Sequence, residues 1–93
     1  MVERRITEVA GRLKRLRAEL SVLDEQLAFL SDAADDARLR ALVSETPLAD
    51  REHHDAQKHA DAMARARQDL LASIAQLERS QDELLDRLVA EPG

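Results

Sequence analysis

The sequence predicts an all-α fold, an antiparallel two-helix coiled-coil hairpin that turns near residues 44–47. Apolar residues recur at alternating spacings of four and three residues in both halves of the chain, the repeat that is typical of coiled coils. Of 93 residues, 44% are hydrophobic, 35% are charged and 1% are aromatic, with 2 Gly and 2 Pro. Such a composition favours long helices over β-rich folds.

The first helix is predicted over about residues 3–44. Its apolar stripe, or seam, consists of Val2, Ile6, Val9, Leu13, Leu16, Leu20, Leu23, Leu27 and Leu30, and it continues with Ala34, Ala37 and Ala41. An alternative is a break near residues 31–36, where Ser31-Asp32 or Asp35-Asp36 offers an N-cap and residues 36–44 form a separate short helix. The helix-forming alanines of this stretch favour the continuous helix.

The turn and the start of the second helix, over about residues 47–90, are marked by Thr46-Pro47. Thr46 is a good N-cap and Pro47 suits the first helical position. Asp50 and Glu52 add negative charge to the first turns, where the helix dipole favours it. The second stripe consists of Ala49, His53, Ala56, Ala60, Met63, Arg67, Leu70, Ile74, Leu77, Gln81, Leu84 and Leu88.

The two stripes match when the chain folds back at residue 45. Every residue of the first stripe then lies opposite a residue of the second stripe that is equally far from the turn, as Leu20 does with Leu70. Alanines meet near the turn and larger aliphatic residues meet toward the open end. We therefore expect one helical-hairpin domain over residues 1–93.

Polar residues interrupt the second stripe at His53, Arg67 and Gln81. A polar residue in a seam disfavours slipped pairings, so we expect these three to set the register. The alternative makes Arg67 and Gln81 ligand contacts inside the hairpin. The basic run at residues 12–17 is expected to pair with acidic residues of the opposite helix, which carries Glu78, Asp82 and Glu83.

Histidines gather near the turn, where His53, His54 and His59 accompany Asp50. Asp50 and His54 share one helix face, but the face that carries His59 points elsewhere. Asp50-Arg-Glu-His53 has the spacing of the Glu-x-x-His motif of bundle-type metal sites but the shorter acid, and no second copy occurs. We expect no metal and no cofactor. A separate hypothesis is that protonation of His53 in the seam loosens the turn end at low pH.

Further apolar residues lie off the seam, where a thin two-helix core cannot cover them, and contiguous exposed apolar surface usually marks an interface. They are Val22, Phe29, Leu39, Leu42, Val43, Leu48, Leu71, Leu85 and Val89. We expect these residues to form a partner interface. The hairpin then either dimerises into a four-helix bundle or binds another protein.

Several function classes are disfavoured. The chain has no cysteine, no apolar run long enough for a membrane span and a net charge of −5, so we expect neither a membrane nor a nucleic-acid partner. No serine or threonine lies in a nucleophile elbow or beside a plausible catalytic base, and no glycine-rich loop occurs. We therefore expect no enzyme and no small-molecule substrate. The absence of a signal segment favours the cytoplasm, and abundant Ala and Arg are typical of a GC-rich bacterial genome.

The sequence thus predicts a non-enzymatic coiled-coil protein that self-associates or docks on another protein through its off-seam apolar residues. One alternative is a transcription-related regulator that binds sigma factor, RNA polymerase or nucleoid proteins by helix-in-groove contact. Another alternative is a metal- or pH-sensing hairpin that uses the histidines near the turn.

Overall fold

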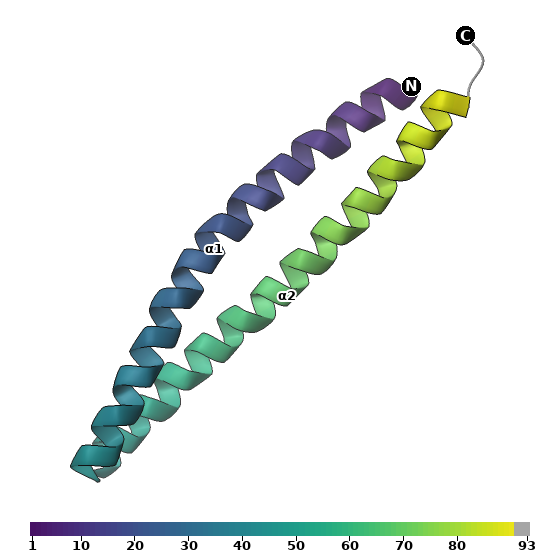
Figure 1. Ribbon diagram of the computed structural model, residues 1–93. Coiled ribbons are helices and arrows are strands. Elements are labelled where there is room, and N and C mark those ends of the chain that lie inside the picture. Colours follow the sequence, from purple (N-terminus) through teal and green to yellow (C-terminus); the bar gives the residue numbers. More distant parts are fainter. Residues whose placement is uncertain (91–93) are drawn as a thin grey trace. The chain divides into compact units, whose positions relative to one another are not determined.

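Two long helices make up the protein in a computed structural model that describes residues 1–90 (Figure 1). Helix α1 spans Val2–Ser44 and helix α2 spans Pro47–Ala90, and no strand occurs among the described residues. The predicted all-α helical hairpin and its boundaries are confirmed to within a residue at the helix ends. Assembly of the hairpin into a bundle remains a prediction.

Helix α1 is continuous through residues 31–36, so the alternative of a break there is wrong. Asp32, Asp35 and Asp36 are exposed, where an aspartate costs a helix little. Ala34 and Ala37 are only 2% and 3% exposed. These small residues pack against α2, and this tertiary contact stabilises α1 as one continuous helix. The polar residues of the same stretch could otherwise have capped a separate second helix.

The turn begins where α1 ends in a left-handed residue. Glu45 has a φ of 52°, and its backbone N–H donates to the carbonyl oxygen of Ala41 at 3.0 Å. A left-handed residue after a helix is common, but it is usually glycine, because a Cβ atom is crowded in that conformation. Glu45 therefore adopts a costly backbone conformation to reverse the chain.

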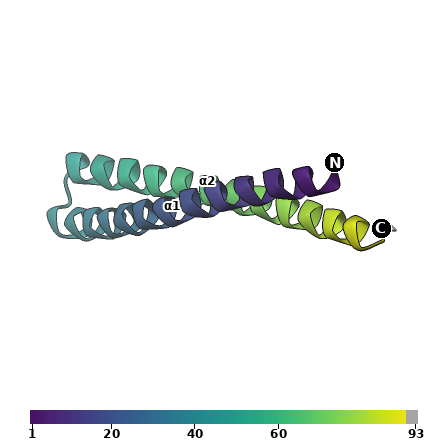
Figure 2. The same cartoon turned by 90° about the horizontal axis from the view of Figure 1, so that it is seen from above.

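Helix α2 starts with the predicted cap, and Figure 2 shows the turn that precedes it. The Thr46 hydroxyl oxygen accepts a hydrogen bond from the backbone N–H of Ala49 at 3.2 Å. The Thr46 carbonyl oxygen accepts the first helical hydrogen bond, from the N–H of Asp50, at 3.0 Å. Thr46 is thus the N-cap and Pro47 the first helical residue, as the sequence predicts.

Packing divides the described chain into two compact units, each built from one segment of α1 and one of α2. The turn unit comprises Val22–Gln68. Its buried residues are all alanines of the two stripes, namely Ala34, Ala37, Ala41, Ala49 and Ala60. Small side chains allow helix axes to approach closely, so this unit has a narrow core.

The terminal unit comprises Met1–Ser21 and the segment that begins at Asp69. Its buried residues are larger, and they are Val2, Leu13, Ile74 and Leu84. Leu13 is the most deeply buried large side chain, at 1% exposure. The other stripe residues of both units are half-buried, except Leu88, which is 37% exposed. Over the described residues, neither helix has a stretch long and apolar enough to cross a membrane.

Candidate functional site

Every predicted interface residue is exposed. The most exposed, Val43 and Val89, leave 85% and 86% of their surface in contact with solvent, and Phe29 leaves 72%. The hairpin therefore leaves its large off-seam apolar side chains uncovered, whereas its seam residues other than Leu88 are buried or half-buried. These side chains lie in both units rather than in one patch, and each group has its own surroundings.

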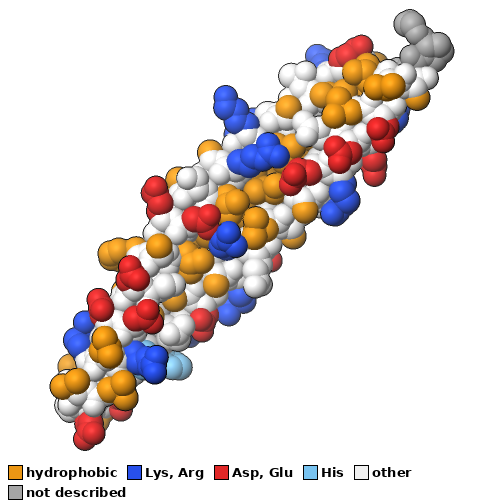
Figure 3. Space-filling view, viewed as in Figure 1, with side chains coloured by type: hydrophobic (Ala, Val, Ile, Leu, Met, Phe, Trp, Pro, Cys, Tyr) orange, Lys and Arg blue, Asp and Glu red, His pale blue; other side chains and the backbone are white. Residues whose placement is uncertain are grey.

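The first group lies at the end of the turn unit and is called the turn cluster. It consists of Leu39, Leu42, Val43 and Leu48. Leu39 lies three and four residues before Leu42 and Val43, so these three share the side of α1 that faces away from the buried Ala37 and Ala41. Leu48 follows in the first turn of α2. Figure 3 shows hydrophobic side chains gathered at this end of the unit, on its lower left.

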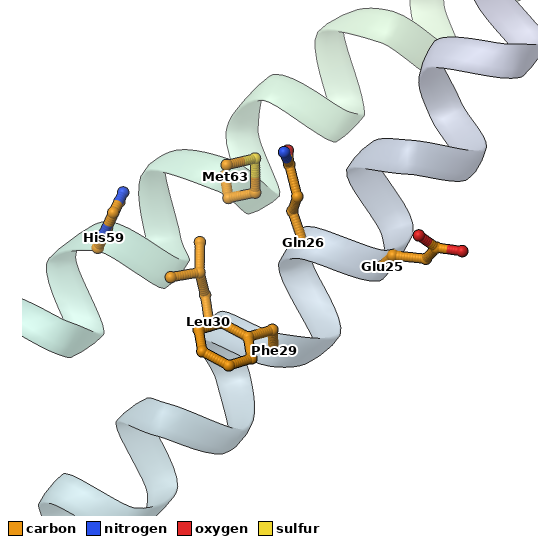
Figure 4. A pocket seen from close by; sticks show the side chains of 6 residues that line it. All are labelled: Glu25, Gln26, Phe29, Leu30, His59 and Met63. Carbon is orange, nitrogen blue, oxygen red and sulfur yellow. The ribbon is translucent and has the colours of Figure 1, made fainter.

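Phe29 belongs to an open groove between the helices of the turn unit, which is called the Phe29 groove. It has a volume of about 420 Å³ and is lined by Glu25, Gln26, Phe29, Leu30, His59 and Met63. Leu30 and Met63 come from facing helices and point into the space between them, whereas Glu25 points away from it (Figure 4). Phe29, the only aromatic residue of the chain, forms a wall of this groove.

The Phe29 groove has a mostly apolar lining because of helical spacing. Leu30 and Met63 are half-buried seam residues, and Phe29 stands beside Leu30 on the outer side of α1. His59 lies one helical turn before Met63. A side chain of another protein that entered this groove would contact a phenyl ring, a leucine and a flexible methionine, which adapts readily to irregular apolar surfaces.

The terminal unit carries the remaining predicted interface residues, Leu71, Leu85 and Val89, all exposed. It also has an open groove of about 260 Å³. The lining of this groove is mostly polar, and it consists of Arg12, Leu16, Ser73, Gln76, Leu77 and Ser80. The turn unit therefore has the more apolar groove of the two.

Arg67 and Gln81, two of the polar seam residues, are half-buried, as is His53. Arg67 donates from Nε to the carboxylate Oδ1 of Asp24, and the two side chains are 39% and 45% exposed. The sequence reasoning missed Asp24. The pairing of the two stripes places Leu23 opposite Arg67. Asp24, the next residue along α1, is therefore within reach of the guanidinium, so the pairing could have predicted this ion pair.

The histidines are spread over different surroundings. His54 lies in an exposed depression with Gln57, Lys58, Asp61 and Arg65, and His59 lines the Phe29 groove. Among residues 1–90, no group of three or more histidine and carboxylate side chains could hold a metal ion. Asp50 and His54 are both exposed on α2. The structure thus does not bring the predicted metal candidates together.

The basic run on α1 contributes one ion pair across the helices of the terminal unit. Arg17 Nη2 lies 3.7 Å from Glu78 Oε2, and both side chains are about half exposed. This contact confirms the predicted pairing of the run with Glu78. Exposed pairs of this kind contribute at most about 1 kcal/mol, so it favours one orientation of the helices more than it stabilises them.

Comparison with known proteins gives no relative from which a role could be carried over. No family profile matches the sequence, and neither curated proteins nor solved structures show a significant match.

Proposed function

We propose that this protein is a non-enzymatic coiled-coil interaction protein whose off-seam apolar residues are covered by another polypeptide chain. The observation that carries the proposal is the exposure of every off-seam apolar residue, with Phe29 72% exposed. Leu39, Leu42, Val43 and Leu48 of the turn cluster are exposed close together, and contiguous exposed apolar residues usually mark an interface.

The narrow core supports the same proposal. The residues buried in the turn unit are alanines, and an alanine side chain buries little apolar area in comparison with leucine. A two-helix chain of this size gains little stability from such a core. Coverage of Phe29 and the turn cluster by another chain adds apolar burial where the hairpin itself provides least.

The chemistry of the exposed surface is that of protein recognition. Aromatic and large aliphatic side chains provide the anchors of protein interfaces, with polar residues around them. Phe29 and Met63 lie among Glu25, Gln26 and His59 in an open groove, whereas small-molecule sites are usually enclosed enough to exclude water. The proposal places the protein in the bacterial cytoplasm, consistent with a sequence that lacks cysteine.

In-cell photo-crosslinking tests the proposal. A photoreactive phenylalanine analogue replaces Phe29 in one variant and Leu42 in a second. The matched control replaces Gln68, an exposed polar residue of the same unit. We expect cross-linked species of discrete mass from the Phe29 and Leu42 positions and few from Gln68. Equal, diffuse cross-linking at all three positions, or none at the apolar positions, contradicts the proposal.

A further inference from the structure

Two rows of charge lie on the outer sides of the turn unit. On α1, Glu25 and Asp32 are seven residues apart, and on α2, Arg51, Lys58 and Arg65 follow the same spacing. All five residues are exposed. A seven-residue spacing keeps side chains on one side of a helix, so α1 carries an acidic row and α2 a basic row. None of the five takes part in an ion pair within the described residues.

The rows flank the same face, on which the Phe29 groove opens. Helical spacing adds Val22 and Ala33 to Phe29 on α1, and Ala62 and Ala66 to His59 on α2. Ala62 also lines a depression with Asp55, Lys58 and His59, which places it on this side. The face therefore has larger apolar residues on α1 and small ones on α2. Glu25 and Asp32 lie along one edge, Arg51, Lys58 and Arg65 lie along the other, and Asp55 lies beside Lys58.

From this arrangement we infer that a second copy of the chain covers the Phe29 groove, with α1 of each copy lying against α2 of the other. The inference rests on the proposed function and specifies its partner. Two identical faces that meet around a two-fold axis can pair α1 with α1 or α1 with α2. The first arrangement places acid against acid and base against base, whereas the second places the acidic row beside the basic row.

The register supports the second arrangement independently. Glu25 and Arg65 are equally far from the turn, and so are Asp32 and Lys58. A two-fold axis parallel to the helices leaves equal distances from the turn at equal heights in both copies. Glu25 and Asp32 then lie level with Arg65 and Lys58 of the second copy, and the turns of both copies lie at the same end.

The sizes of the apolar side chains also fit this arrangement. Pairing α1 with α2 of the second copy places Phe29 near alanines such as Ala62 and Ala66. Large side chains that meet small ones across an interface interdigitate without overpacking. The apolar contacts supply affinity, and the charge rows select the pairing of helices.

Charge reversal of one row at a time is the first test, measured by sedimentation equilibrium at low salt. Glu25→Lys/Asp32→Lys makes both rows basic, and Lys58→Glu/Arg65→Glu makes both acidic. We expect each variant to self-associate about tenfold more weakly than the natural chain, because attraction becomes repulsion in every pair. An equal mixture of the two variants, and a single chain that carries all four substitutions, should regain the natural affinity.

The matched control is Asp82→Lys/Asp86→Lys, which changes net charge by the same amount as Glu25→Lys/Asp32→Lys on exposed residues of the terminal unit, away from the groove and both rows. It should leave self-association within about twofold of the natural chain, since exposed charges outside a contact matter little. Equal weakening by the control, or no recovery in the mixture, overturns the role of the rows.

A distance between copies tests the orientation. The chain has no cysteine, so Ser44→Cys carries a single spin label at the turn. The inferred arrangement predicts a distance below about 30 Å between labels. The α1-to-α1 arrangement centred on Phe29 separates the labels by about 45 Å at 1.5 Å per residue.

The outcomes separate this inference from the proposed function. If the natural chain remains monomeric, or if the labels lie about 45 Å apart, the inference is wrong. In either case, cross-linking of Phe29 to a different protein still supports the proposed function. Cross-links at Phe29 that join two copies of this chain support both.

Discussion

Arg67 of α2 and Asp24 of α1 form a 2.5 Å hydrogen-bonded ion pair beside the seam of the turn unit. The pair shows how a charged residue is accommodated at a seam position. The guanidinium finds a carboxylate next to Leu23, and both side chains stay partly in water. This geometry fixes which residues face each other, because a slip of one helical turn separates the two charges.

A double-mutant cycle measures that coupling. Asp24→Ala, Arg67→Ala and the double variant are unfolded in urea and followed by circular dichroism. We expect a coupling energy of about 0.5 kcal/mol at low salt, because both side chains are partly exposed. The coupling should shrink at high salt, since exposed charges are screened. A coupling of zero at low salt contradicts the structural role of this pair.

Loss of the Leu13 side chain should destabilise the protein most among single alanine substitutions in the terminal unit. Leu13 is 1% exposed, and replacing a buried leucine with alanine costs about 3 kcal/mol. Leu39→Ala is the matched control, because Leu39 is exposed and should change the free energy of unfolding by less than about 0.5 kcal/mol. Similar costs at both positions would show that the seam is not the core.

Glycine at position 45 should stabilise the hairpin. Glu45 has a left-handed backbone, which costs a residue with a Cβ atom about 1 kcal/mol relative to glycine. Glu45→Gly should therefore raise the free energy of unfolding by about 1 kcal/mol, measured in urea. Glu45→Ala, which keeps the Cβ atom, should give no such gain, and a stabilised alanine variant would point to the glutamate charge instead.

Removal of the Thr46 cap should weaken the start of α2. Thr46→Ala deletes the oxygen that accepts from the Ala49 N–H and should lower the free energy of unfolding by about 1 kcal/mol. Thr46→Ser restores an equivalent acceptor and serves as the control. If the alanine and serine variants unfold at the same urea concentration, the cap does not stabilise the helix.

The fold could be predicted from the sequence because few features of the chain conflict with the repeat of apolar residues. The apolar spacing identifies both helices, and Thr46-Pro47 locates the turn independently of either stripe. The left-handed Glu45 was not foreseeable, since glutamate has no preference for that conformation. The aspartates at residues 32–36 also left the helix open to a break, which the buried Ala34 and Ala37 prevent.

The candidate site could be predicted only in part from the sequence. The positions off the seam predict which apolar residues are exposed, because only one side of each helix faces the other helix. The grouping of Phe29 with Met63 and His59 in one groove required the pairing of the helices in space. Asp24 was missed because its own helix shows an ordinary polar residue there, and only the opposite helix gives it a partner.

Sedimentation equilibrium of the natural chain tests most directly whether a second copy covers the Phe29 groove. At concentrations up to about 100 µM, which reveal any contact with a Kd below that value, we predict a molar mass that rises to twice the 10.4 kDa of one chain. Phe29→Ser should shift this rise to higher concentration. A mass of one chain throughout the range, or a dimer that Phe29→Ser leaves unchanged, would contradict the account.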